Sequence, residues 1–371
     1  MIRRFKILIK CIEISFCLST AAINAQILKD SASINLIKKD IGYVYNFQFD
    51  NARDLFNKIS QAYPIHPVTF LVKGMTTYWE NYPLLPTSPA RVSYEEDMRR
   101  CIELSEKKHN TSEDAEYLLA DLCARGMLLL FYADNDLSMD VFPLATNTYQ
   151  YIRRSFDFTS VYSDFYFFTG LYDYYREAYP EAHPIYKALA FLFPKGDKAR
   201  GLKGLKTAAA NSIVLKAESF SFLSVIFLSF ENNFTQASYY SKTLHELYPA
   251  NVQYLAEYIK NLLLIKQYDE AERLIIYSGT NITNSFYQAQ LAVFNGILQE
   301  KKYHDYKTSQ QLYLKGARDI AMFGDYGNDI EAYAYFGLSR ISDVNGDKLY
   351  KKTYRKLAQK LAEYKKIDFD Q

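Results

Sequence analysis

The residues of this sequence that look most suited to chemistry lie in a glycine-flanked basic stretch, residues 195–206. Gly196 and Gly201 have the spacing of a phosphate-binding loop, but that motif continues with Lys and Ser or Thr. Here Leu202 and Lys203 follow, and no hydrophobic strand precedes the stretch. The sequence therefore argues against a nucleotide site.

The same stretch carries a local excess of positive charge, with Asp197 as its one acidic residue. The basic residues are Lys195, Lys198, Arg200, Lys203 and Lys206. Charge runs of this kind usually form a solvated helix face. The alternative is a contact with an anion or an acidic partner at a helix N-terminus, which Asp197 would cap, and it makes Lys198 and Arg200 candidate contact residues.

The sequence contains only weak patterns for metal binding, nucleophilic catalysis or acid–base catalysis. No two of the histidines stand at the helical spacing of metal ligands: His66, His109, His183, His245 and His304. Cys101 and Cys123 do not form a Cys-x-x-Cys pair, and no Gly-x-Ser-x-Gly elbow occurs. Residues 95–97 are adjacent carboxylates expected on one exposed turn, where they would point in different directions. We predict no catalytic, cofactor or metal site and do not expect an enzyme.

The clearest pattern lies in the elements that would position any site. Phe234-x-x-Ala237 recurs as Tyr268-x-x-Ala271 after 34 residues, and Pro249 follows Ala237 by twelve. An upstream copy has the same spacing and consists of Phe49, Ala52 and Pro64. This period is the signature of a tetratricopeptide (TPR) helical hairpin. It predicts an all-α, TPR-like α-solenoid of stacked antiparallel helical hairpins over residues 26–371, clearest at 33–66, 218–251 and 252–280.

Apolar spacing gives the remaining helices. Beside the repeats at 34–45 with 49–63, 213–230 with 234–248 and 251–266 with 268–277, it predicts helices near 67–82, 92–108, 112–133, 138–156, 162–179, 195–210, 283–301, 305–323 and 329–343. Residues 347–371 should hold a polar capping helix. Ser112 is expected to cap its helix, and the aromatic helix near 162–179 should be buried on most of its surface. The proline-containing loop 81–92 is read as a connector rather than the flank of a groove.

The amino-acid composition also limits the classes of function that are possible. Of 371 residues, 49% are hydrophobic and 23% charged, and the formal net charge is +2. That composition is typical of a globular chain, and the charge gives no drive towards nucleic acid. The most apolar run, 220–230, is too short for a membrane span, which needs about twenty residues.

The first 25 residues have the outline of a secretory signal: a basic start, an apolar stretch at 14–22 and the small residue Ala25 before Gln26. No lipoprotein cleavage box precedes Cys17. We expect export to the periplasm or cell envelope of a bacterium, or a cytoplasmic protein if the segment is an ordinary helix. After export, Cys101 and Cys123 could pair or remain two small buried hydrophobes.

The order of motifs in the middle of the chain carries a resemblance. Gly170-Leu171-Tyr172-x-Tyr174-Tyr175 is followed by Ala188-Leu-Ala-Phe-Leu192, then Gly196-Asp197 and Gly201-Leu202. Over roughly residues 45–275 the chain resembles bacterial TPR proteins whose eukaryotic relatives include the tetratricopeptide repeat protein 39 and inclusion-body-clearance families. The resemblance implies a helical scaffold without established catalytic residues.

The leading hypothesis for function is therefore a non-catalytic scaffold that binds a protein or peptide. The concave surface of the regular repeats should be lined by Phe222, Ile226, Phe230, Glu257 and Lys260, although ordinary packing explains the three hydrophobic residues equally well. The second hypothesis is a glycan-binding or nutrient-uptake accessory protein, in which Tyr172 would stack on a sugar. A third, an enzyme with an α/α toroid, would need two carboxylates converging in a deep pocket.

Overall fold

The computed structural model describes residues 27–108, 114–187, 191–279, 281–364 and 366–370. These residues form helices, short 3₁₀ turns and loops, and no strand occurs among them. The predicted signal segment and the predicted cap at Ser112 lie outside the described residues. The α-helices are α2 (Ser31–Tyr45), α3 (Phe49–Ala62), α4 (Pro67–Glu80), α5 (Ala90–Glu106), α6 (Asp114–Asp134), α7 (Ser138–Ser155), α8 (Phe165–Ala182), α10 (Lys198–Asn211), α11 (Lys216–Ser229), α12 (Phe234–Leu247), α13 (Val252–Leu264), α14 (Tyr268–Gly279), α15 (Ser285–Lys301), α16 (Tyr306–Ile320), α17 (Asn328–Val344) and α18 (Lys348–Leu361).

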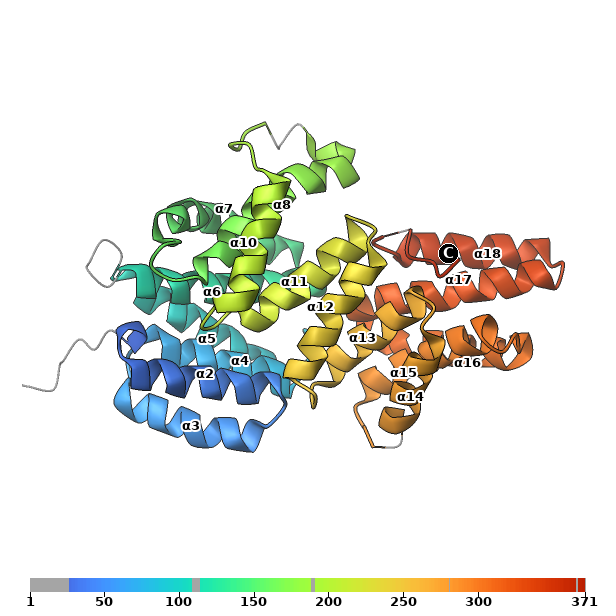
Figure 1. The fold of residues 1–371 in the computed structure, drawn as a ribbon, viewed down its shortest axis with the longest axis horizontal. Coiled ribbons are helices and arrows are strands. Elements are labelled where there is room, and N and C mark those ends of the chain that lie inside the picture. The colour runs from blue at the N-terminus through green and yellow to red at the C-terminus, as the bar shows by residue number, and fades with distance from the viewer. Residues whose placement is uncertain (1–26, 109–113, 188–190, 280, 365, 371) are drawn as a thin grey trace, which may run out of the picture.

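Consecutive helices pack as hairpins, and the first helices of successive hairpins also touch (α2 with α4, α4 with α6, α13 with α15, α15 with α17). This double contact defines a solenoid, so the predicted all-α architecture of stacked hairpins is confirmed. In Figure 1, α11–α13 occupy the centre, between the amino-terminal hairpins and the carboxyl-terminal hairpins. The middle of the array is irregular, because the α8/α10 hairpin contacts α7 and α11 instead.

The alanines that set the sequence period are buried where helices pack together. Ala52, Ala237 and Ala271 are buried, with at most 1% of their surface exposed. At Ala237 the carbonyl oxygen accepts hydrogen bonds from Ser224 Oγ (3.1 Å) and Asn261 Nδ2 (3.3 Å), which join α11, α12 and α13. A larger side chain would separate these helices, which explains why a small residue recurs there.

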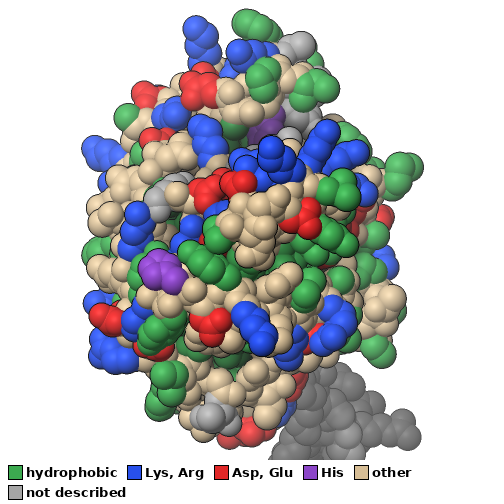
Figure 2. Space-filling model, turned by 90° about the vertical axis from the view of Figure 1, so that its right-hand side faces the viewer, with side chains coloured by type: hydrophobic (Ala, Val, Ile, Leu, Met, Phe, Trp, Pro, Cys, Tyr) green, Lys and Arg blue, Asp and Glu red, His purple; other side chains and the backbone are tan. Residues whose placement is uncertain are grey.

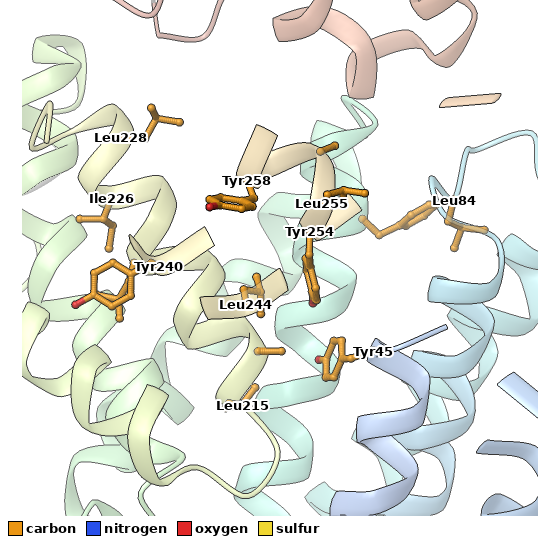
Figure 3. Close-up of a cluster of buried hydrophobic side chains, with 14 of the residues drawn as sticks. Tyr45, Leu84, Leu215, Ile226, Leu228, Tyr240, Leu244, Tyr254, Leu255 and Tyr258 are labelled. Atoms are coloured by element: carbon orange, nitrogen blue, oxygen red, sulfur yellow. The ribbon is translucent and has the colours of Figure 1, made fainter. Parts of the chain in front are cut away.

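The amino-terminal hairpins meet the middle of the array at an aromatic cluster. Tyr45 at the end of α2, Trp79 at the end of α4 and Tyr254 in α13 are in mutual contact, with ring centroids 5.6–6.4 Å apart. Tyr254 lies beside Tyr45 in Figure 3. Asn251 Nδ2 donates to the Tyr45 carbonyl over 2.9 Å, and both residues are buried. The solenoid therefore curls until its first hairpins touch the central helix α13.

The proline-containing loop after α4 is part of this closure, which corrects its interpretation as a mere connector. The Tyr82 ring lies 5.9 Å from the Tyr326 ring and 6.1 Å from Phe286, and its carbonyl accepts a hydrogen bond from Asn284. Leu84 is fully buried. The loop thus fixes the amino-terminal hairpins against α15 and the segment before α17.

Three further predictions, for Asp97, for the two cysteines and for α8, can be compared with the structure. Asp97 is buried and its carboxylate pairs with Lys73 at 2.9 Å, so residues 95–97 do not form one exposed turn. Cys101 and Cys123 are buried free thiols, in keeping with the small-hydrophobe alternative. In α8 only part of the aromatic surface is buried, and Tyr179 is 36% exposed.

A glycine contact explains the motif order that prompted the family resemblance. A Cβ atom on Gly201 would lie 2.6 Å from the Tyr174 backbone nitrogen and 2.8 Å from the Gly170 carbonyl oxygen. Helices α8 and α10 can cross this closely only because both positions are glycine. Asp197 caps α10 as predicted, accepting from the Arg200 backbone N–H.

Several carboxyl groups are buried without adequate partners. Asp40 has no exposed surface, and neither of its oxygens accepts a well-formed hydrogen bond. Burial raises the pKa of Asp40 to about 7, and a backbone group of Phe56 offsets only part of this. Burial likewise raises the pKa of Glu218 to about 8. Each group favours the protonated form in the folded state.

The contact between α2 and the central helix α13 should be testable at Asn251. Its side chain caps α13 and also makes the buried bond to Tyr45, whereas Asn233 only caps α12. Asn251→Ala should lower the free energy of unfolding by roughly 2–4 kcal/mol, and Asn233→Ala by about 1 kcal/mol. Urea denaturation of both variants measures the difference, and equal losses would contradict a stabilising closure.

The buried carboxyls predict a pH dependence of stability. The unfolded chain releases these protons near pH 4 but the folded chain holds them until about pH 7–8, so stability falls as pH rises through that window. For Asp40 alone the full effect is on the order of 4 kcal/mol. Asp40→Asn and Glu218→Gln should flatten the fall in the unfolding midpoint between pH 5 and pH 8.5, measured by calorimetry. An unchanged slope in the double variant would contradict this assignment.

Candidate functional site

The residues proposed from sequence for a concave groove have different environments. Ile226 has no exposed surface and belongs to the core, so it cannot touch a partner in this conformation. Phe222 is half-buried against Phe167, with ring centroids 5.4 Å apart. Phe230 packs on Tyr364 at 5.5 Å and lines a hollow that opens to solvent.

The two polar groove candidates, Glu257 and Lys260, pair with each other on α13. Lys260 is buried, and both residues lie close enough to Asp329 to act on its pKa, Lys260 lowering it and Glu257 raising it. Asp329 lines a second hollow, described below, and Glu257 is partly exposed.

The remaining candidates come from the α8/α10 hairpin. Tyr172 donates a hydrogen bond to the Pro194 carbonyl over 2.7 Å. The Arg200 guanidinium makes two hydrogen bonds to Asp173, at 2.5 and 2.6 Å. Lys198 pairs with Glu181 and Glu231 at 3.2 and 3.5 Å. Burial alone would lower the pKa of Lys198, but these two carboxylates raise it above its usual value. Lys198 and Arg200, two of the five basic residues in this stretch, are thus paired with carboxylates of the fold.

Two of the predicted residues, Phe230 and Lys198, come together in a hollow of about 520 Å³, which we call the mixed hollow. It lies where the ends of α8 and α11, the start of α10 and the segment after α18 meet, and its lining also includes Glu181, His183, Glu363, Tyr364 and Lys366. The His183 Nε2 atom is buried there without a hydrogen-bond partner. Cationic and anionic groups both face this space.

Glu363 also lines a neighbouring space of about 430 Å³, which we call the acidic hollow. Its described lining has five carboxylates and two phenol rings, with no Lys or Arg: Tyr82, Asp134, Asp136, Asp325, Tyr326, Asp329 and Glu363. The other lining residues are Ala133, Asn328 and Leu361. Such a space concentrates negative potential, since its low-dielectric walls screen the charges poorly.

Three carboxylates of the acidic hollow, Asp134, Asp329 and Glu363, have raised pKa values. Burial raises the pKa of Asp134 to about 7, with a further contribution from Glu363. Desolvation and the Asp329 carboxylate raise the pKa of Glu363, although part of this side chain is solvent-exposed. Burial also raises the pKa of Asp329, which a backbone hydrogen bond partly offsets. The hollow is therefore unfavourable for its own charges and favourable for an incoming cation.

The segment after α18 holds Glu363 in place. The Glu363 backbone N–H donates to Asp329 Oδ1 over 3.0 Å. Further on, Ile367 and Phe369 are buried, and Arg340 donates a hydrogen bond to the Asp368 carbonyl. Glu363 thus stands between the two hollows on a segment anchored at both sides.

Sequence reasoning missed the acidic hollow because its walls come from four separate segments. The local signals are slight: Asp134 and Asp136 flank one residue at the end of α6, and Asp325 precedes Asp329 by four. Neither spacing marks a site without the closure that brings residues 82, 134 and 326 together. Acidic and basic side chains are interspersed on the face seen in Figure 2, so a hollow walled by one sign of charge is a local feature.

Within the described part of the chain, no group of three or more His, Cys, Asp and Glu side chains could hold a metal ion. None of the helices described is long and apolar enough to cross a membrane. Comparison of the chain with protein-family models found no match, and comparison with curated proteins found none either.

Charge crowding in the acidic hollow should reduce the stability of the free protein. At pH 8 Asp134 is ionised in the folded state at a cost that the unfolded chain does not bear, whereas at pH 4.5 it is protonated. Asp134→Asn should therefore raise the thermal unfolding midpoint at pH 8 and change it little at pH 4.5. The exposed residue Asp157 lies outside the hollow, and Asp157→Asn is the matched control. A destabilised Asp134→Asn at pH 8 would contradict the crowding.

Proposed function

We propose that this protein is a non-catalytic TPR-type scaffold that binds a protein or peptide partner, and that a basic segment of the partner enters the acidic hollow. The observation that carries the proposal is the set of five carboxylates facing one solvent-filled space without a cation in its described lining. A Lys or Arg side chain placed there would relieve the mutual repulsion and would be held by several carboxylates at once.

Two phenol rings share this lining, although Trp79 stacks on one face of Tyr82 at 5.1 Å. Tyr82 and Tyr326 contact each other edge to face, with centroids 5.9 Å apart. A ring face attracts a cation, and the effect grows when the site excludes water. The adjoining mixed hollow, with Phe230 and Tyr364, would accept apolar and acidic groups of the same partner. An extended peptide could cross both spaces over Glu363.

Membership of the bacterial TPR proteins related to the tetratricopeptide repeat protein 39 and inclusion-body-clearance families remains part of this proposal. It is supported by the recurring Ala237 and Ala271 contacts and by the Gly170–Gly201 crossing. We place the protein in the cell envelope, on the basis of the signal-like segment at residues 1–25. Its partner would then be an exported or envelope protein.

A glycan-binding or nutrient-uptake role has weaker support. The Tyr172 ring is tilted against Tyr149 at 6.1 Å and meets Phe156 edge-on at 6.0 Å, and its hydroxyl is already bonded to Pro194. A sugar platform needs a free ring face, and these contacts leave little of it.

The proposal predicts binding of a basic peptide that depends on the acidic hollow. A fluorescent decapeptide rich in Lys and Arg should bind the wild-type protein at pH 8, weaken with added salt, and weaken again below pH 6 as Asp134 is protonated. The double variant Asp134→Asn/Glu363→Gln should reduce its affinity at least about tenfold, measured by fluorescence anisotropy.

Two controls sharpen this experiment. Asp157→Asn removes one carboxylate elsewhere and should leave affinity unchanged, and a neutral peptide of equal length should not bind. A photo-crosslinking residue at Asn328, which lines the hollow, should capture the native partner in cells, whereas one at position 157 should not. Equal binding by wild type and double variant would exclude the hollow as the site.

A further inference from the structure

The first residues that the structure describes are held by a buried carboxylate. Ile27 and Leu28 are 0% and 7% exposed, and both belong to the hydrophobic core. The Ile27 backbone N–H donates to Glu116 Oε1 over 3.0 Å, and the Leu28 N–H donates to Glu116 Oε2 over 2.9 Å. One carboxylate in α6 therefore receives two successive backbone groups of a 3₁₀ turn almost ninety residues earlier in the chain.

Glu116, which accepts these two hydrogen bonds, is buried beside a second polar side chain. Glu116 is only 4% exposed, and its Oε1 atom lies 2.9 Å from Nε2 of His66, which is also buried. The Nδ1 atom of His66 accepts a hydrogen bond from the Val68 N–H. In the neutral ring the proton is therefore on Nε2, the nitrogen nearer to the Glu116 carboxylate. The Nε2 atom is not aligned for a hydrogen bond with that carboxylate. Between the turn and these groups remains a cavity of only about 20 Å³. The fit around the turn is close.

The sequence adds an independent observation. The signal-like segment ends at Ala25, so its expected cleavage would make Gln26 the first residue, one position before Ile27. We propose that the Glu116–His66 site is the receptor for the mature N-terminus: the chain is cut between Ala25 and Gln26, and the new terminus docks through Ile27 and Leu28.

Charge supports this assignment. Hydrolysis of the Ala25–Gln26 peptide bond consumes one water and leaves an α-ammonium group on the residue covalently linked to Ile27. A buried carboxylate that accepts backbone N–H groups is stabilised further by a positive charge one residue away. In the uncut chain a neutral peptide group replaces this charge.

The burial of Ile27 and Leu28 also determines whether cleavage or docking comes first. A protease that cuts before Gln26 must hold the following residues in an extended form, and Ile27 and Leu28 are the second and third of these. In the folded protein both are buried and hydrogen-bonded in a turn. Cleavage therefore precedes docking, after which Ile27 and Leu28 pack against residues of α4 and α6.

The test begins with the full precursor expressed in a bacterium that exports it. Intact mass and N-terminal sequencing should show a mature chain that begins at Gln26. An aminopeptidase added to this folded protein should stop within one residue, at Ile27. Glu116→Gln removes the charge and one of the two acceptors, and it should let trimming pass Leu28.

Stability gives a second readout. A mature chain that begins at Lys29 keeps the Asp30 cap of α2 but lacks the docking residues. Its thermal midpoint should fall by several degrees relative to the chain that begins at Gln26, and acetylation of that chain's terminus should lower the midpoint by less. Glu96→Gln, an exposed position on α5, is the matched control and should change neither readout. Exported, folded protein that retains residues 1–25, a mature chain that starts beyond Leu28, or an unchanged midpoint for the Lys29 chain would each overturn the proposal.

Discussion

Each helical hairpin of this protein has an apolar face that it can cover only with a neighbouring hairpin. At the regular repeats the neighbour is the next hairpin, and small residues such as Ala237 and Gly201 let the helices approach. At the ends of an open solenoid that cover runs out, and terminal repeats usually become polar, as the last helix α18 does. The amino-terminal hairpins are covered in another way, because Tyr45 and Trp79 pack against Tyr254 of the central helix α13.

The contact between the amino-terminal hairpins and the rest of the array also shapes the surface. It places the loop after α4 and the end of α6 next to the segments that flank α17. As a result, Asp134, Asp329 and Glu363 surround one space. The same contact that hides aromatic surface thus concentrates carboxylates at its margin. Stabilisation from the buried rings can offset the repulsion between these charges, which is how a folded protein can keep an unfavourable site.

The sequence was sufficient for features that depend on neighbouring residues. The aromatic-x-x-Ala spacing and Pro64 and Pro249 located hairpins whose helices end within a few residues of the expected positions. It was insufficient wherever distant segments meet. Ile226 and Phe230 are one helical turn apart and equally apolar, yet one is in the core and the other lines a hollow, because the segment after α18 leaves space beside Phe230. Asp97 seemed exposed because its burial depends on packing between α4 and α5. The curvature of the array is the sum of small rotations between successive hairpins, and no local sequence pattern determines it.

The buried carboxylates separate into groups with different roles. Asp164 accepts backbone N–H groups from Ile213, Val214 and Leu215 at 2.7–2.9 Å, and Glu116 accepts two more from the first turn. These groups fasten loops, since removing such an acceptor leaves buried donors unpaired. Asp40 has no such donors and is enclosed, so a change in its protonation affects stability alone. Asp134 is as unfavourably placed as Asp40, with a pKa also near 7, but it faces a space that solvent and ligands can enter. A charge that is both poorly satisfied and accessible can be satisfied only from outside the chain. That is the physical reason to assign recognition to the acidic hollow rather than to any other buried carboxylate of the fold.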